Sequence, residues 1–199
     1  MSGRSVILVV EDRLSEAVST KILEGLGIEI SQRLGLKGKG YLQSKAQSLN
    51  QTAKGFPVFM LTDQDSPSHC PPQLIQAWIK GERHPKFFLR VAVMEVESWI
   101  MADRRGFAGF LSIPLNRIPE DTDAIPQPKE FLLSLTRLSK KASLRQEILP
   151  PPGATSRVGP GYNSRLGEFV YNHWNVNLAA FVSVSLQRTL ARLRNFDIA

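Results

Sequence analysis

The sequence predicts an α/β fold with a central, mostly parallel sheet flanked by helices and a helical C-terminal extension. Three short apolar runs, at residues 6–10, 56–62 and 87–94, have the length and composition of buried strands. Helical patterns separate these runs, and this alternation is typical of sheets whose faces are covered by helices. We expect an α/β core over residues 1–106 and a mostly helical extension over residues 107–199 that packs on the same core.

The elements of the first half follow from local signals. After the first strand, Ser15 is expected to cap a helix whose apolar residues recur at four-residue spacing. Residues 27–30 predict a short strand, and the glycine- and lysine-rich segment 34–40 predicts a flexible basic loop. A helix is expected over residues 41–54, before the second apolar run, and another over residues 72–80.

The second half is expected to be helical wherever its pattern is regular. A helix begins at about residue 95, directly after the third apolar run. The proline-rich segment 107–128 predicts a connecting loop. Helices are expected over residues 129–140, 163–174 and 182–196, the second of them capped by its first residue, an asparagine.

Composition limits the classes of protein to consider. The chain has 199 residues, of which 42% are hydrophobic and 22% charged, so it should fold around a substantial core. A single cysteine excludes a disulfide framework within the chain. Neither a membrane span nor a secretion signal is predicted, and we expect a cytoplasmic protein. The net charge of +7 favours a polyanionic partner such as DNA or RNA, although a basic protein without such a partner is the alternative.

Carboxylates follow each of the three apolar runs. Glu11 follows the first run, Asp63 and Asp65 the second, and Glu95 and Glu97 the third. The carboxyl ends of parallel strands share one edge of the sheet, where ligands bind. Carboxylates gathered there repel each other unless a cation joins them, and Mg²⁺ or Mn²⁺ is the natural choice. The alternative for each position is a helix cap or a solvated loop residue.

Three segments resemble the Toprim fold, which topoisomerases, primases and OLD-family nucleases share. VVED ending at Asp12 and LTDQD ending at Asp65 resemble its metal-binding Glu and DxD motifs, and VAVMEVESWIMAD resembles a family of small uncharacterised Toprim-like proteins. The signature residues of that family are Glu97, Ser98, Trp99, Ala102 and Asp103. The resemblance implies that Glu11, Asp63 and Asp65 bind Mg²⁺, and it implies an ATPase partner. Asp12 departs from the Toprim pattern, which has glycine there; it either narrows the turn or adds a ligand.

These observations predict a metal-dependent nuclease, and the resemblance implies a role in phage defence or repair. Glu11 would be a metal ligand or general base, Asp63 and Asp65 would hold Mg²⁺, and Glu97 or Glu95 would complete the site. The candidate contacts to nucleic acid are Lys37, Lys39, Arg104, Arg105, Arg188 and Arg192. We expect the side chain of Trp99 to lie in the core.

Two other functions remain open. The first is a non-catalytic Toprim-like subunit that binds nucleic acid or an ATPase, since a fold does not determine a function. The second is a phosphorelay receiver domain with Asp63 as its phosphoacceptor. A receiver also needs a further apolar strand that ends in lysine, and the sequence has no such strand after residue 94.

Overall fold

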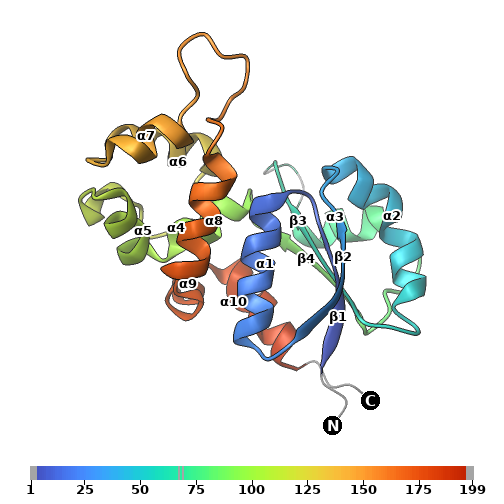
Figure 1. Ribbon diagram of the computed structural model, residues 1–199. Helices are drawn as coiled ribbons and strands as arrows, with labels where there is room; N and C mark the ends of the chain where they lie inside the picture. The colour runs from blue at the N-terminus through green and yellow to red at the C-terminus, as the bar shows by residue number, and fades with distance from the viewer. Residues whose placement is uncertain (1–3, 67, 69, 196–199) are drawn as a thin grey trace.

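The computed structural model describes residues 4–66, 68 and 70–195. Its centre is a four-stranded sheet with the order β2-β1-β3-β4, in which all neighbouring strands are parallel (Figure 1). The strands are β1 (Ser5–Val10), β2 (Glu29–Gly35), β3 (Val58–Asp63) and β4 (Phe87–Ala92). The predicted α/β class, with a parallel sheet flanked by helices, is therefore confirmed.

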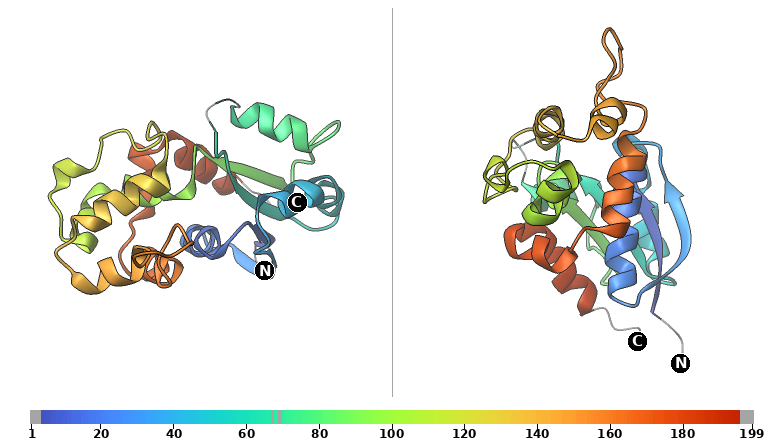
Figure 2. Two further views of the ribbon diagram at one scale, coloured as in Figure 1. Left: turned by 90° about the horizontal axis from the view of Figure 1, so that it is seen from above. Right: turned by 60° about the vertical axis from the view of Figure 1, so that its left-hand side comes forward.

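Helices cover both faces of the sheet (Figure 2). Helices α1 (Arg13–Gly25) and α10 (Val184–Arg194) lie on one face, and α2 (Lys39–Thr52) and α3 (Pro71–Trp78) lie on the other. Successive side chains of a strand point to opposite faces, so β3 contributes to both hydrophobic clusters. This two-sided burial explains why β3 is a continuous apolar run rather than an alternating one.

The remaining helices lie beside the α1 face of the sheet (Figure 1). They are α4 (Val96–Ala102), α5 (Arg104–Leu111), the 3₁₀ turn η1 (Leu115–Arg117), α6 (Pro128–Arg137), α7 (Ala142–Ile148), α8 (Tyr162–Asn172) and α9 (Val176–Val182). One hydrophobic cluster runs from Val6 on β1 to Leu193 on α10, so these helices share their core with the sheet. None of the helices in the described ranges is long and apolar enough to cross a membrane.

The second strand differs from its prediction. A short strand over residues 27–30 and a basic loop over residues 34–40 were expected, but β2 continues to Gly35 and α2 begins at Lys39. Only residues 36–38 connect the two elements. Strand β2 is an edge strand whose central side chains are exposed, so it lacks the apolar run that identifies a buried strand.

Both predicted helix caps are wrong. The N-cap of α1 is Asp12, whose carboxylate Oδ1 accepts a hydrogen bond of 2.8 Å from the backbone N–H of Ser15. Ser15, which was expected to be the cap, instead lies three residues after the cap and donates the N–H that Asp12 accepts. Helix α8 begins at Tyr162, one residue before the asparagine expected to cap it. The aspartate that departs from the Toprim pattern therefore has a structural task.

Short helices account for the other differences. Helix α5 extends into the segment 107–128 that was predicted to be a loop, and the predicted domain boundary after residue 106 falls inside it. Helices α7 and α9 were not predicted; each has seven residues, too few for a clear helical period. Helix α10 runs to Arg194, and the last residue predicted for it, Phe196, lies outside the described residues.

Candidate functional site

The acidic residues lie where the direction of strand addition reverses. From β1 the chain adds β2 on one side and β3 on the other, so the switch point falls between β1 and β3. Glu11 follows β1 and Asp63 ends β3, so they flank this point at the carboxyl edge, where α/β sheets bind their ligands. A cleft of about 750 Å³ opens beside them, toward α6 and α8. Its lining includes Asp12, Asp65, Met94, Glu95, Lys129 and Tyr162.

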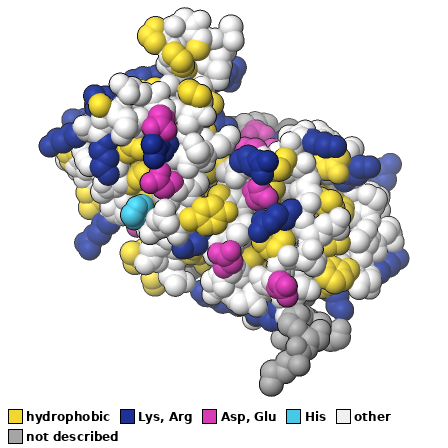
Figure 3. Space-filling model, viewed as in Figure 1, with side chains coloured by type: hydrophobic (Ala, Val, Ile, Leu, Met, Phe, Trp, Pro, Cys, Tyr) yellow, Lys and Arg dark blue, Asp and Glu magenta, His cyan; other side chains and the backbone are white. Residues whose placement is uncertain are grey.

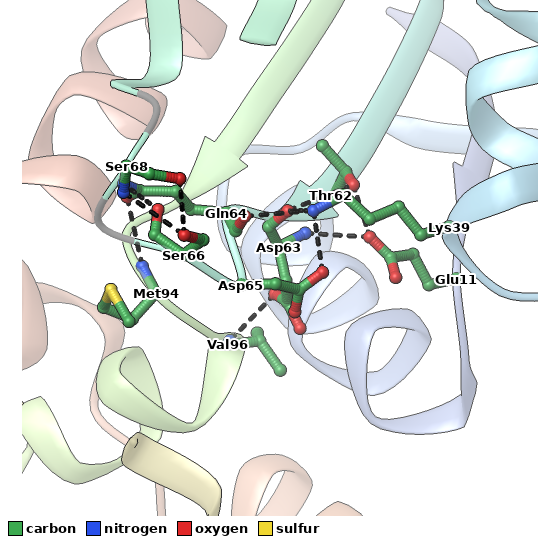
Figure 4. Close-up of polar contacts among 10 residues, drawn as sticks. All are labelled: Glu11, Lys39, Thr62, Asp63, Gln64, Asp65, Ser66, Ser68, Met94 and Val96. Atoms are coloured by element: carbon green, nitrogen blue, oxygen red, sulfur yellow. Dashed lines mark hydrogen bonds and ion pairs between the residues drawn. The ribbon is translucent and has the colours of Figure 1, made fainter. Parts of the chain in front are cut away.

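Hydrogen bonds from neighbouring strands orient the carboxylates of Glu11 and Asp63 (Figure 4). The backbone N–H of Asp63 donates to Glu11 Oε1 over 2.8 Å, and the hydroxyl of Thr62 donates to the same oxygen. The backbone N–H of Val96, at the start of α4, donates to Asp63 Oδ1 over 2.9 Å. The end of β3 and the segments that follow β1 and β4 thus meet at this pair of carboxylates.

Lys39 places an ammonium group inside the site (Figure 4). Its Nζ donates to Asp65 Oδ2 over 2.7 Å and to the backbone carbonyls of Asp63 and Gln64 over 2.7 and 3.0 Å. It reaches these oxygens from the first turn of α2. Lys39 was predicted to contact nucleic acid; in the structure it is a partner of the DxD segment.

The two glutamates after β4 have different surroundings. Glu97 is only 2% exposed, and its Oε1 accepts a hydrogen bond of 2.7 Å from the hydroxyl of Tyr162. Lys129 Nζ lies 3.5 Å from the same oxygen, while the buried Oε2 has no hydrogen-bond partner among the described residues. Glu95 lines the cleft, and its Oε2 accepts from the backbone N–H of Lys129, in the first turn of α6. Glu97 therefore forms a buried acidic cluster with Asp63 and Glu11. Glu95 instead binds the backbone at the start of α6.

Burial raises the pKa values of three carboxyl groups in the cluster. The pKa of Asp63 lies well above its ordinary value because of burial and because of the nearby charges of Glu97 and Glu11. Burial also raises the pKa of Glu97, although Lys129 and Tyr162 oppose the shift. The pKa of Glu11 is raised by burial, against the hydrogen bonds that it accepts. The cluster therefore holds more negative charge than its surroundings stabilise.

Lys129 and Tyr162 are site residues that sequence reasoning missed. Burial lowers the pKa of Lys129, but Glu97, Glu95 and Asp63 outweigh this effect and hold it above its usual range. The pKa of Tyr162 is raised well above its ordinary value by burial and by the charge of Glu97. Both residues come from the helical second half, and no local pattern connects them to the strand ends. Thr62 could have been found, because it is the polar residue just before the DxD motif.

Two residues beside the cluster have left-handed backbone conformations. Asp65 has φ of 62° and Met94 has φ of 59°, and the N–H of Asp65 donates to the carbonyl of Met94 over 2.8 Å. Such conformations cost energy for residues other than glycine and are concentrated at functional sites. The two strand ends that carry Asp63 and Glu95 are joined by this strained contact.

The donor set fits a divalent cation held by few protein ligands. Within the described ranges, no three Asp, Glu, His or Cys side chains are grouped so that they could hold a metal ion. Mg²⁺ is often bound through only one or two carboxylates, with water and substrate phosphates completing its shell. Carboxylate oxygens are hard donors, and within the described part of the chain the buried Oε2 of Glu97 has no hydrogen-bond partner. The residues therefore fit Mg²⁺ or Mn²⁺ bound in this way, and not a cation enclosed by protein alone.

The other predicted nucleic-acid contacts lie on separate parts of the fold. Lys37 lies over an aromatic ring of α2, with Nζ 5.3 Å from the ring centroid. Arg104, on α5, donates two hydrogen bonds to a backbone carbonyl near η1, and its neighbour Arg105 is exposed. Arg188 and Arg192 lie on α10. On the face seen in Figure 3, basic side chains are interspersed with acidic ones and form no single patch.

The residues of the segment VAVMEVESWIMAD join α4 to the C-terminal helices. Trp99 is fully buried, and its Nε1–H donates to Ser185 Oγ over 2.6 Å. The carboxylate of Asp103 accepts from the backbone N–H groups of Gly106 and Asn175 over 3.1 and 2.8 Å. The expectation that Trp99 belongs to the core is confirmed.

Comparisons with models of protein families, with curated proteins and with solved structures found no match to this chain. The resemblance to Toprim proteins therefore stays a prediction from three short segments. Function has to be inferred from the site, because one fold can host many functions.

The hydrogen bond between Tyr162 and Glu97 leads to a stability prediction. We expect Tyr162→Phe to lower the free energy of unfolding by about 1–3 kcal/mol, since the buried carboxylate loses its closest donor. Urea denaturation would measure the change, with Tyr171→Phe as the matched control because Tyr171 is 44% exposed. Equal stability of the two variants would show that the buried hydrogen bond contributes nothing.

Proposed function

We propose that this chain is a Mg²⁺- or Mn²⁺-dependent phosphodiesterase that acts on nucleic acid. One observation carries the proposal: the buried carboxylate of Asp63, at the switch point of a parallel sheet and beside an open cleft, lies close enough to Glu11 and Glu97 for their charges to raise its pKa. A divalent cation held there would polarise a phosphodiester and lower the pKa of a bound water molecule.

The chain's own residues divide the remaining tasks. Asp63 and Glu97 are fixed by Val96 and Tyr162, so their carboxylates are oriented before a ligand binds. Burial raises the pKa of Glu11 and so makes its carboxylate a stronger base, and it serves as metal ligand or general base. Lys129 lines the cleft with a charge that can attract the phosphate of a substrate.

A non-catalytic subunit is the second candidate, and Lys39 favours it. Its ammonium group already bonds to Asp65 and to two backbone carbonyls of the DxD segment, which reduces the need for a metal ion there. Such a subunit would bind nucleic acid or an ATPase in a defence or repair system, in keeping with the resemblance to Toprim-like proteins. A receiver domain has less support, since Asp63 is 7% exposed and the described residues contain no fifth strand.

A cleavage assay tests the proposal. The full chain is incubated with supercoiled DNA, linear DNA or RNA in Mg²⁺, Mn²⁺ or EDTA. We expect metal-dependent cleavage that falls by about 10²-fold or more in Glu11→Gln, because that change removes a charge and a proton acceptor while keeping the shape. Glu24→Gln is the matched control, because Glu24 is exposed on α1.

The outcomes separate the two candidates. Binding of DNA or RNA without cleavage under any metal condition would favour the non-catalytic subunit. Cleavage that persists in EDTA, or that is equally fast in Glu11→Gln and wild type, would contradict the phosphodiesterase.

A further inference from the structure

A second cavity lies at the outer edge of β4, between α3 and α10. It has a volume of about 500 Å³. Figure 2 shows α3 and α10 on opposite sides of this edge strand. Val93 lines this cavity, whereas the next residue, Met94, lines the acidic cleft, so the two cavities lie on either side of the same short segment.

Four arginines gather at this cavity, and none of them forms an ion pair with a described acidic residue. Arg83, Arg90 and Arg188 line it, and Arg192 is close enough to influence the charge of Arg83 and Arg90. Burial and the three neighbouring guanidinium groups lower the pKa of Arg90 to about 10.

The hydrogen bonds of these arginines use only part of their donor capacity. Arg90 Nε donates to the hydroxyl of Thr189 over 3.2 Å, and Arg83 donates one bond to a backbone carbonyl over 3.3 Å. Asp123 also lines the cavity, but its two carboxylate oxygens accept hydrogen bonds from Ser183 and Ser185. Each guanidinium group has five N–H donors, so several remain for a ligand.

The rest of the lining is apolar and is contributed by elements on both sides of β4. The apolar residues are Pro71, Pro72, Ile75, Ile79, Val91 and Val184. Helices α3 and α10 both begin at the cavity, with Pro71 and Val184 as their first residues. The positive ends of two helix dipoles therefore add to the charge of the arginines.

We propose that this cavity binds a nucleotide, with its phosphates on Arg83, Arg90 and Arg188 and its base against the apolar wall. Guanidinium groups bind phosphate oxygens in pairs, and a cluster of them suits a ligand with more than one negative charge. The volume falls in the range of roughly 300–1,000 Å³ that is usual for small-molecule sites. A free nucleoside diphosphate and the 5′-phosphorylated end of a strand share this chemistry. The inference stands independently of the function proposed for the acidic cleft.

Calorimetric titration of the full chain in EDTA tests the proposal. The probes are ADP, adenosine, and a short oligodeoxynucleotide with either a 5′-phosphate or a 5′-hydroxyl. We expect ADP or the phosphorylated oligonucleotide to bind, and adenosine and the unphosphorylated oligonucleotide to bind at least tenfold more weakly. Arg188→Gln and Arg83→Gln should each weaken binding of the phosphorylated probe by about tenfold or more.

Controls separate a specific site from general basic charge. Arg137→Gln, at an exposed position on α6, removes the same charge elsewhere and should leave the affinity unchanged. Thermal unfolding of each variant would show that Arg188→Gln, an exposed substitution, keeps the fold. Binding of ADP identifies a free nucleotide as the ligand, and binding of the phosphorylated oligonucleotide alone identifies a strand end. Failure of both probes to bind, or equal affinity in Arg188→Gln and wild type, would overturn the proposal.

Discussion

Asp63→Asn is expected to abolish metal-dependent cleavage and at the same time to stabilise the metal-free protein. Asparagine keeps an oxygen that can accept the hydrogen bond from Val96, but it removes a buried charge that faces Glu97 and Glu11. We expect the cleavage rate to fall by about 10²–10³-fold or more. The free energy of unfolding in EDTA should rise by an amount on the order of 1 kcal/mol, because functional charge clusters are maintained at the expense of stability.

The same charge predicts how stability depends on pH. The pKa of Asp63 is higher in the folded chain than in the unfolded chain, so the folded state binds more protons between these two values. The free energy of unfolding of the metal-free protein should therefore fall as pH rises from about 4, the ordinary carboxyl value, through the raised folded-state value. Glu97 and Glu11 contribute with the same sign. Urea denaturation over a pH series should show that the free energy of unfolding decreases less with rising pH in Asp63→Asn than in wild type.

Two further measurements make this prediction specific. Asp121→Asn is the matched control. Asp121 also accepts one backbone hydrogen bond, but its side chain is exposed and lies outside the buried acidic cluster. Its stability should change little. Adding Mg²⁺ should raise the melting temperature of wild type more than that of Asp63→Asn, since a ligand that binds the folded state stabilises it by mass action. A variant less stable than wild type in EDTA would mean that Asp63 is a structural acceptor rather than a strained ligand.

The acidic edge could be predicted from the sequence because it depends on strand ends alone. An apolar run followed by a carboxylate marks such an end, and parallel strands bring their carboxyl ends to one edge. Predicting Glu11 and Asp63 as site residues required no knowledge of tertiary structure beyond that rule. The choice between Glu95 and Glu97 did need it, since the two differ in whether they face α6 or the buried cluster.

The partners of the acidic residues could not be predicted, because packing of distant segments brings them together. Lys129 and Tyr162 reach Glu97 from helices that follow proline-rich connections. The arginines of the second cavity are spread over a loop, β4 and α10, and only the edge position of β4 collects them. Arg188 and Arg192 were predicted to contact nucleic acid, but no local pattern connects them to Arg83 and Arg90.

Gly35→Ala is expected to be the most destabilising single substitution that we propose. Gly35 ends β2 opposite Val10, with φ of +104°, and an added Cβ would lie 2.1 Å from the backbone oxygen of Val10. An L-residue would be strained at this φ, and the clash is with main chain that cannot rotate away. Strain and overpacking each cost about 1–3 kcal/mol, so the free energy of unfolding should fall by roughly 2–6 kcal/mol.

Gly27→Ala and Gly25→Ala distinguish the clash from the other effects of adding a methyl group. Gly27 also has a left-handed φ, of +64°, but its Cβ would meet none of the described atoms within 4 Å, so only strain of about 1–2 kcal/mol is expected. Gly25 is helical and open, and alanine there should stabilise α1 by about 0.5–1 kcal/mol. Urea denaturation should give the lowest free energy of unfolding for Gly35→Ala, a higher one for Gly27→Ala and the highest for Gly25→Ala. A Gly35→Ala protein at least as stable as Gly27→Ala would refute the close approach of β2 to β1.

Gly35→Ala should also affect the acidic site, because Glu11 directly follows the residue that is displaced. The N–H groups of Leu36 and Gly38 donate to the carbonyls of Val10 and Glu11 over 2.9 and 3.1 Å, so the end of β1 is held by the segment after β2. Pushing Val10 away would move Glu11 relative to Asp63, whose backbone N–H donates a hydrogen bond to the carboxylate of Glu11. We therefore expect Gly35→Ala to lose cleavage activity even at temperatures where it stays folded, whereas Gly27→Ala should keep it. A segment that looked like a loose basic loop would then be what positions the first carboxylate.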